Sequence, residues 1–156
     1  MDFGIIRSIT LCDLDKIVEL ERKCFNEYIA YTPKQLKYLI TRAHSISLAE
    51  IKYDVLRGFI IVLYKNGSSV AGIETLNVDP MFQGNGIGKK LLSAAEVEIY
   101  SKGLDRIRLE VSIGNISAIK LYERSGFRKT AILKDYYLNK QYGSRDAFKM
   151  VKELTT

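Results

Sequence analysis

One short stretch decides the fold of this chain: Gln83-Gly84-Asn85-Gly86-Ile87-Gly88. It follows a strand pattern over residues 70–78 and precedes a helix pattern that begins near Gly88. A helix N-terminus has unpaired N–H groups and the positive end of the helix dipole, and glycines let an anion come close to the backbone. The stretch therefore indicates a site for a phosphate or pyrophosphate, unless it is only a surface loop.

Length and composition favour one globular domain over residues 1–156. Hydrophobic residues make up 47% of the chain and charged residues 27%, which is an ordinary balance for a soluble protein. No apolar run approaches the roughly 20 residues that a membrane-spanning helix needs, and the N-terminus lacks the basic and apolar regions of a signal peptide. We therefore expect a cytoplasmic protein with no membrane partner.

The chain carries a net charge of +6, and its last third is locally basic. A basic surface attracts nucleic acid, binds an anionic cofactor or simply faces solvent. Because no nucleic-acid-binding module accompanies the charge, we expect no nucleic-acid partner. The single histidine, His44, has no Cys or carboxylate at metal-ligand spacing, so we also expect no metal. Cys12 and Cys24 fall on one predicted helix, too far apart to pair, and are expected to be small buried apolar residues.

Apolar periodicity and turn residues divide the chain into strands and helices. Strands are expected over residues 3–9, 45–51, 58–64, 70–78, 106–111, 127–133 and 145–151. Helices are expected from the cap at Thr10 to residue 25, over residues 33–43, from 88 to a stop at 102–103, and from 115 to a stop at 126. Thr10 with Asp13 and Thr32 with Pro33 are typical helix starts. The order β-α-α-β-β-β-α-β-α-β-β predicts a mixed α/β fold.

A second motif covers the helix expected from Asn115 and consists of Asn115-Ile116-Ser117-Ala118-Ile119-Lys120-Leu121-Tyr122-Glu123-Arg124-Ser125-Gly126-Phe127. Asn115 and Tyr122 are two helical turns apart on nearly the same face, with Ala118 between them. A small residue between two polar ones leaves room for a ligand along that face. A capping asparagine and a core tyrosine would give the same pattern.

The two motifs, with one helix and one strand between them, resemble the GNAT superfamily of acetyl-CoA-dependent N-acetyltransferases. The first fits the family's Q/R-x-x-G-x-G/A loop, and the second fits its N-x-x-A-x-x-L-Y-x-x-x-G-F helix. The resemblance covers about residues 70–151, with an acetyl-CoA-binding core over about 70–130, whereas the N-terminal part agrees in element order only. It implies a mostly antiparallel central sheet flanked by helices.

Two shorter segments, Leu109-Glu110-Val111 and Asp135-Tyr136-Tyr137, resemble the RimI-like group of this superfamily. These enzymes acetylate N-terminal α-amines, so the resemblance implies a protein or peptide N-terminus, such as that of a ribosomal protein, as the acceptor. A lysine side chain, a polyamine or another small amine is the alternative acceptor. A non-catalytic acyl-CoA-binding or assembly subunit with the same fold is a further alternative, and the chain is expected to be a monomer or a homodimer.

The resemblance assigns the acetyl-CoA cosubstrate to the glycine-rich loop, the strand before it and the second motif. The implied contacts are the backbone groups of Leu76, Asn77 and Val78, the loop residues Gln83, Gly84, Asn85, Gly86, Ile87 and Gly88, and the side chains of Lys89, Asn115 and Tyr122. The acetyl group is thereby expected at the end of the strand that precedes the loop.

Acetyl transfer from a thioester to an amine needs a base for the amine and an acid for the departing thiolate. The resemblance implies Tyr122 as the acid and Glu110 as the base. Glu110 shares a strand face with Arg108. It lies on a central strand, where it is either this base or the partner of a neighbouring Lys or Arg in a plain ion pair. Glu74 is the rival base, although other branches of the superfamily place theirs two positions earlier, where this chain has Gly72. A water relay that serves either carboxylate is a further possibility.

Aromatic residues are expected at the acceptor side of the site, namely Phe25, Tyr31, Tyr136 and Tyr137. Phe25 and Tyr31 lie between the first two helices, and the other two lie in the loop over residues 134–144, where similar tyrosines bind the peptide backbone in N-terminal acetyltransferases. These rings form either the two walls of a substrate groove or ordinary packing contacts. The expected reaction is direct attack by the amine in a ternary complex.

Overall fold

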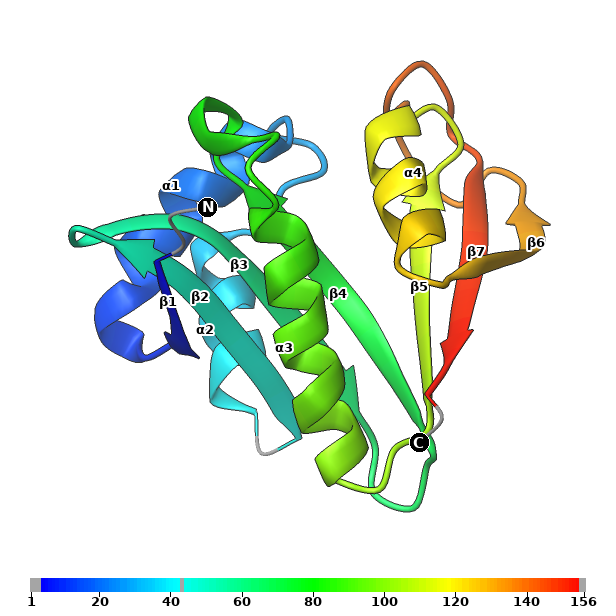
Figure 1. Cartoon of the computed structure of the whole chain (residues 1–156). Helices are drawn as coiled ribbons and strands as arrows, with labels where there is room; N and C mark the ends of the chain where they lie inside the picture. The colour runs from blue at the N-terminus through cyan, green and yellow to red at the C-terminus, as the bar shows by residue number, and fades with distance from the viewer. Residues whose placement is uncertain (1–3, 43, 155–156) are drawn as a thin grey trace.

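The computed structural model describes residues 4–42 and 44–154. Its centre is a seven-stranded sheet with the strand order β1-β2-β3-β4-β5-β7-β6 (Figure 1). The strands are β1 (Ile5–Ser8), β2 (Ser45–Lys52), β3 (Val55–Tyr64), β4 (Val70–Val78), β5 (Arg106–Ser112), β6 (Arg128–Leu133) and β7 (Ala147–Glu153). The helices are α1 (Leu14–Cys24), α2 (Pro33–Thr41), α3 (Ile87–Ser101) and α4 (Ile116–Arg124), and short 3-10 turns cover Leu11–Asp13 and Pro80–Phe82.

The predicted order of strands and helices is confirmed, and most element ends agree with the prediction to within a few residues. The main differences are that β3 begins earlier, at Val55, and that β7 runs on to Glu153. Phe3 and Ala43, expected to begin the first strand and end the second helix, lie outside the described residues. Every pair of neighbouring strands is antiparallel except β4 with β5, so the expected mostly antiparallel sheet is also confirmed.

Helices cover both faces of the sheet. In Figure 1, α3 and α4 lie in front of it, and α1 and α2 lie behind it. On β3, Ile60 and Val62 belong to the apolar cluster that includes α3, whereas the alternate residues Phe59 and Ile61 belong to the cluster that includes α1 and α2. Because side chains alternate across a strand, one continuous apolar run supplies both cores.

The parallel strands β4 and β5 diverge, and the divergence opens the sheet. They pair only where residues 70–72 face residues 106–108. Beyond this short ladder β4 pairs with β3 and β5 pairs with β7, so two halves of the sheet spread apart (Figure 1). A bulge at Glu74 bends β4 just beyond the ladder. We call β1–β4 with α1, α2 and α3 the N-terminal half, and β5–β7 with α4 the C-terminal half.

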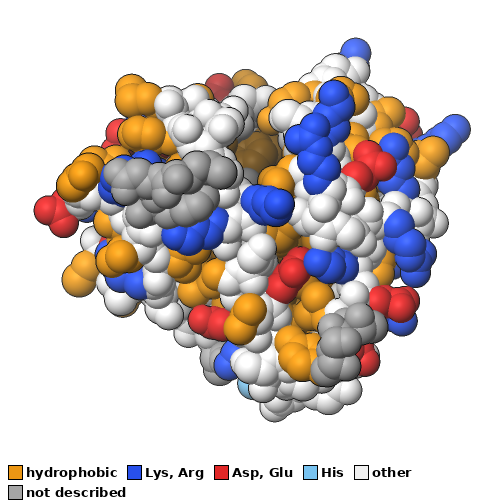
Figure 2. All heavy atoms as spheres, in the orientation of Figure 1, with side chains coloured by type: hydrophobic (Ala, Val, Ile, Leu, Met, Phe, Trp, Pro, Cys, Tyr) orange, Lys and Arg blue, Asp and Glu red, His pale blue; other side chains and the backbone are white. Residues whose placement is uncertain are grey.

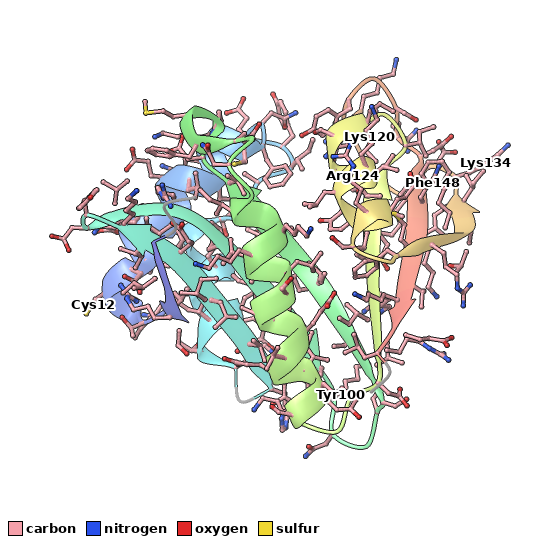
Figure 3. The ribbon with its side chains drawn as sticks, viewed as in Figure 1. Cys12, Tyr100, Lys120, Arg124, Lys134 and Phe148 are labelled. Atoms are coloured by element: carbon pink, nitrogen blue, oxygen red, sulfur yellow. The ribbon has the colours of Figure 1, made fainter. Side chains whose placement is uncertain are left out.

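The starts of the first two helical segments are confirmed, because Thr10 and Thr32 each form a capping box. The cysteine prediction is wrong for Cys12, which lies in the turn before α1, is exposed, and stands at the edge of the molecule in Figure 3. The α-helix begins only at Leu14, so Cys12 is outside its buried face. Cys24 is half-buried at the end of α1. In the described part of the chain, no helix has the length and apolar character needed to cross a membrane.

Candidate active site

A pocket of about 410 Å³ lies where β4 and β5 diverge. Its walls come from α1, the α1–α2 connection, β4, β5, α4 and the β6–β7 connection. The space-filling view shows a hollow between the two halves, with an apolar floor and Lys and Arg side chains on both sides (Figure 2). The divergence therefore brings together segments that are far apart in the sequence.

The glycine-rich loop leads directly into α3, as the sequence predicts. Gly84 and Gly86 have positive φ angles of 84° and 78°, and Gly86 immediately precedes the first turn of the helix. The first helical hydrogen bond is donated by the Lys90 amide to the Gly86 carbonyl, and no described residue accepts from the amides of residues 87–89. Adjacent free N–H groups at a helix start form an anion site.

The first turn of α3 has a charge that favours a bound anion. It contains Lys89 and Lys90 and no acidic residue, and no side chain caps it. Cations and uncapped amides are both unfavourable at a helix N-terminus, and a bound anion relieves both. A Cβ on Gly88 would lie 3.2 Å from Leu121 of α4, so glycine also allows close packing of the two halves here. These residues fit the pyrophosphate of a coenzyme A thioester.

Two polar side chains of the loop maintain its shape. Gln83 Nε2 donates to the Val78 carbonyl at 3.2 Å, and Asn85 Nδ2 donates to the Phe82 carbonyl at 2.9 Å. Both side-chain amides are thus used within the loop. The backbone of the loop, rather than these side chains, is what remains available for a ligand.

The end of β4 offers backbone groups along the opening. Leu76 lines the pocket, and beyond residue 72 no described strand pairs with the edge of β4 that faces β5. Asn77 does not present its side chain to a ligand, because it is 1% exposed and its Nδ2 donates to Glu21 Oε1 at 2.9 Å. Of the residues over 76–78, we therefore keep only the backbone as candidate ligand contacts.

The second motif lies on α4, where it borders the opening (Figure 1). Asn115 caps this helix, because its Oδ1 accepts from the Ala118 amide at 3.3 Å, and Asn115, Ala118 and Tyr122 all line the pocket. Tyr122 packs edge-on against Phe127, with 5.7 Å between the ring centroids. Burial, with a smaller contribution from Tyr137, raises the pKa of Tyr122, so its phenol stays protonated at neutral pH. Tyr122 therefore presents a protonated phenol at the pocket wall.

Glu110 lines the pocket from β5 and forms an ion pair with Arg108 on the same strand face. Arg108 Nη1 lies 3.1 and 3.3 Å from the two Glu110 carboxylate oxygens. The Glu110 side chain is 19% exposed, so the ion pair does not remove it from the pocket. A Cβ on Gly72 would lie 3.0 Å from the Arg108 guanidinium carbon. Arg108 therefore occupies the space beside Gly72, where a base on β4 would otherwise project.

Glu74, the rival base, lines the same pocket from the bulge of β4. Its Oε2 accepts a hydrogen bond from the Tyr31 hydroxyl at 3.0 Å. Burial, followed by the negative charge of Glu74, raises the pKa of Tyr31, so this tyrosine remains a donor. Glu74 thus joins β4 to the α1–α2 connection.

Sequence analysis missed Glu21, a buried carboxylate of α1 that also lines the pocket. Its Oε1 accepts from Thr75 Oγ1 at 3.1 Å and from Asn77 Nδ2, and its Oε2 accepts from the Tyr31 amide at 3.1 Å. Burial raises the pKa of Glu21, and these hydrogen bonds offset part of the rise. We call Glu21 and its three donor residues, Tyr31, Thr75 and Asn77, the Glu21 network. Its only sequence signal is a glutamate within the apolar stripe of a helix.

All the predicted acceptor-side aromatics line the pocket, namely Phe25, Tyr31, Tyr136 and Tyr137. Tyr136 and Tyr137 pack edge-on with 4.9 Å between ring centroids, and burial raises the pKa of Tyr137 to about 12. The highly exposed Tyr28, from the same aromatic segment as Phe25 and Tyr31, and Leu138 also line it. The pocket mouth therefore has aromatic side chains from the α1–α2 connection and from the β6–β7 connection.

A helix start with free amides beside a pocket with a carboxylate and a protonated tyrosine is the arrangement that an acyltransferase using a coenzyme A thioester requires. The family model described as the acetyltransferase (GNAT) family matches residues 14–127, and the chain belongs to this family. The match confirms the expected superfamily. It also extends into the N-terminal half, where the sequence motifs alone indicated only the order of elements.

The [ribosomal protein bS18]-alanine N-acetyltransferase of Haemophilus influenzae is 30% identical over 94% of this chain and 97% of the relative. Other curated N-acetyltransferases match at 37 to 42% identity over shorter segments, so that the chain spans only about half of their length. Among solved structures, the ribosomal-protein-S18-alanine N-acetyltransferase of Escherichia coli has a TM-score of 0.86 at 24% identity, with 97% and 94% of the two chains covered. A Thermoplasma acidophilum N-acetyltransferase in complex with coenzyme A has a TM-score of 0.80 at 24% identity, with 98% and 99% covered. At these identities the two structures show the fold.

Proposed function

We propose that this chain is an acetyl-CoA-dependent N-acetyltransferase whose acceptor is the N-terminal α-amine of a protein or peptide, such as a ribosomal protein. The names of relatives that match over nearly the whole chain support this acceptor. The observation that carries the proposal is that Glu110 and Tyr122 line one pocket beside the anion site of α3. We further propose that it acts in the cytoplasm, as a monomer or homodimer.

The cosubstrate is proposed to bind along the opening between the halves. The free amides of residues 87–89 and the nearby Lys89 hold its pyrophosphate. The backbone of residues 76–78 and the side chain of Asn115 hold its pantetheine arm. This arrangement brings the thioester to the wall where Glu110 and Tyr122 lie.

The residues of the pocket supply the acid, the base and the electrostatic stabilisation that the reaction needs. The acceptor ammonium loses a proton to Glu110, directly or through a water molecule, and the free amine attacks the acetyl carbonyl carbon. As the C–N bond forms, N–H groups at the end of β4 stabilise the negative charge that builds on the carbonyl oxygen. The C–S bond then breaks, and Tyr122 gives its proton to the departing thiolate. The attacking nitrogen, which still carries one proton more than an amide, returns that proton to the Tyr122 phenolate, directly or through water. Transfer is direct, because both substrates are held in one pocket as a ternary complex.

The aromatic residues around the mouth support a peptide as the acceptor. Tyr31 from the α1–α2 connection and Tyr137 from the β6–β7 connection line the same pocket. Flat rings on two sides suit an extended chain, which exposes little more than its backbone near the first residue. A polyamine needs only carboxylates around it.

A panel of acceptors tests the proposal through Tyr122. We expect radiolabelled acetyl-CoA to label a peptide with a free N-terminus, and neither the same peptide with a blocked N-terminus and an internal lysine nor spermidine. Tyr122→Phe should lower the rate of transfer about 100-fold, because the phenol no longer donates a proton, while the Kd for acetyl-CoA stays the same. Tyr100→Phe is the matched control at the far end of α3 (Figure 3) and should change nothing.

Two results would contradict the proposal. Label on the internal lysine or on spermidine alone would replace the α-amine by one of these acceptors. Binding of acetyl-CoA without transfer to any member of the panel would favour a non-catalytic acyl-CoA-binding subunit.

A further inference from the structure

A second hollow, of about 470 Å³, lies in the C-terminal half on the face of the β5–β7–β6 sheet. Its polar lining consists of Arg106 and Arg108 from β5, Lys149 from β7, and Arg128 and Thr130 from β6. Two valines complete the lining. The active-site chemistry described above does not account for so many cations on one surface.

Strand alternation places these cations on the face opposite α4. Ile107, Leu109 and Met150 belong to the apolar cluster that contains α4 residues, so the side chains between them point the other way. Arg108 lies opposite Val151, and Val151 lies opposite Arg128 in the next strand. In Figure 1, α4 lies in front of β5, so this basic face is directed away from the viewer.

The basic face keeps an excess of positive charge after its ion pairs are counted. Glu153 lies 3.7 Å from Arg106 and 3.5 Å from Arg128, and it is shared between them. Arg108 pairs with Glu110. No ion pair among the described residues involves Lys149, so the face retains unneutralised cations. These guanidinium and ammonium groups are half-exposed or exposed and therefore available to an anionic ligand.

The basic face is continuous with the active-site pocket. Arg108 lines the second hollow, whereas its ion-pair partner Glu110 lines the first. Lys149 lies directly opposite Glu110 in the β5–β7 ladder. The charges of Glu110 and Arg108 both act on Tyr136 of the pocket. Burial and Glu110 raise the pKa of Tyr136, and Arg108 lowers it. An acceptor chain that runs from Glu110 along β5 toward Arg106 therefore passes beside these cations.

We propose that the basic face binds acidic side chains of the acceptor polypeptide downstream of the amine that is acetylated. This inference rests on the proposed function and adds a substrate class to it. Residues two apart on a strand are about 7 Å apart, so Arg108 lies about 7 Å and Arg106 about 14 Å from Glu110 along β5. An extended peptide advances about 3.4 Å per residue. Aspartate or glutamate at about the third to fifth residue of the acceptor is therefore the preferred ligand.

The lining favours carboxylates over a nucleic acid. None of the described residues that line the hollow is aromatic, so it offers no ring on which a base stacks. Glu153 and Glu110 border the cations and would repel a continuous phosphate backbone. Arginine forks bind single carboxylates through paired hydrogen bonds. Position beside the acceptor pocket and charge complementarity therefore point to the same occupant.

The test compares two peptides and two double variants. One peptide has glutamate at residues three and five, and the other has glutamine there. We expect the acidic peptide to have a roughly tenfold higher kcat/KM, because two partly exposed charge pairs form. The preference should disappear in Arg106→Gln/Arg128→Gln, with kcat/KM for the glutamine peptide unchanged. It should also disappear at about 1 M salt.

The matched control is Lys102→Gln/Lys129→Gln, which removes the same charge from outside the basic face. Lys129 lies over the Phe148 ring, on the other face of the β6–β7 pair, and Lys102 caps the end of α3. This variant should keep the full preference for the acidic peptide. A third peptide with its glutamates at residues nine and eleven should behave like the glutamine peptide.

Direct binding separates failure of this inference from failure of the proposed function. The Kd of a fluorescent acidic peptide is measured by anisotropy in all proteins, whether or not transfer occurs. Arginine-dependent binding without transfer supports the basic face and contradicts the acetylation proposal. Equal kcat/KM and equal Kd for both peptides overturn the inference and leave acetylation intact. Competition is measured with a short RNA and with unlabelled acidic peptide, at equal concentrations of negative charge. Stronger displacement by the RNA also overturns the inference, in favour of nucleic acid.

Discussion

Two carboxylates that line the pocket, one from each half of the molecule, are held in contrasting ways. In the N-terminal half, Glu21 is 1% exposed and accepts hydrogen bonds from uncharged donors only. In the C-terminal half, the Glu110 side chain is 19% exposed and is paired with a cation, Arg108. A carboxylate enclosed by neutral donors ties segments together, whereas one that reaches a pocket beside a charged partner is able to exchange a proton with a substrate.

The same contrast holds for the surfaces of the halves. The N-terminal half has helices on both faces of its strands, and the C-terminal half has α4 on one face (Figure 1). The doubly covered half supplies the anion site at α3 and the rigid edge of β4. The other half supplies the proposed acid, the proposed base and an exposed basic face. The anion site and the proposed proton-transfer groups therefore lie on opposite sides of the line where β4 and β5 part.

The largest expected effect separates Glu110 from the rival base Glu74. Glu110→Gln should lower kcat about 1,000-fold, because an amide does not take the proton of the amine. Glu74→Gln should lower it by less than about tenfold, since its expected role is to hold Tyr31. Steady-state kinetics, with thermal unfolding to show that both variants fold, measures the difference. A large loss in Glu74→Gln with little change in Glu110→Gln would reverse the assignment.

A smaller effect, on the pH dependence of the free energy of unfolding, tests the buried carboxylate Glu21. Because burial raises the pKa of Glu21 from its ordinary 4.5, the folded state binds a proton that the unfolded state has released. The free energy of unfolding should therefore fall as pH rises from about 4.5 through the folded-state pKa, by up to about 1.4 kcal/mol per pH unit. Glu21→Gln should remove this contribution. The difference in free energy of unfolding between the variant and the unchanged protein, measured by urea titration, should therefore change with pH across that range.

The control for this experiment is Thr75→Val, which removes one hydrogen bond to Glu21 and leaves the Glu21 carboxylate in place. The free energy of unfolding of this variant should still fall as pH rises through the same range. A constant difference between Glu21→Gln and the unchanged protein at all pH values would mean that Glu21 titrates alike in both states.

The predictable features are those that short stretches of sequence encode. The loop before α3 and the Asn115 helix are visible because backbone geometry demands glycine or a capping side chain at fixed spacing. The strand alternation around Arg108 and Glu110 was likewise predicted, and both now lie on one face. Such local rules correctly indicate the elements, their order and part of the pocket lining.

The features that were not predictable depend on contacts between distant parts of the chain. Glu21 accepts hydrogen bonds from residues as far as 56 positions away. The sequence of α1 gives no indication of these donors. The basic character of the last third was visible, but the basic face exists only because β7 is inserted between β5 and β6. The prediction for Cys12 was wrong for a local reason. A short 3-10 turn stands where apolar periodicity had predicted the start of a helix.

The smallest effect concerns the contact that closes the N-terminal half over the pocket. The Tyr31 hydroxyl donates to Glu74 at 3.0 Å, and the Tyr31 amide donates to Glu21. Tyr31→Phe removes only the first bond, so the free energy of unfolding should fall by about 1 kcal/mol. The KM for the peptide should rise about threefold, since a wall of the acceptor groove is held less firmly.

A double-mutant cycle isolates this contact from the rest of the wall. Tyr31→Phe, Glu74→Gln and the double variant should show a coupling of roughly 0.5–1.5 kcal/mol in the free energy of unfolding, because each single change breaks the same bond. The same cycle with Tyr31→Phe and Glu110→Gln should be additive, since Glu110 pairs with Arg108 on the opposite half. Coupling across the opening in place of coupling to Glu74 would mean that the halves are not independent in the unbound protein.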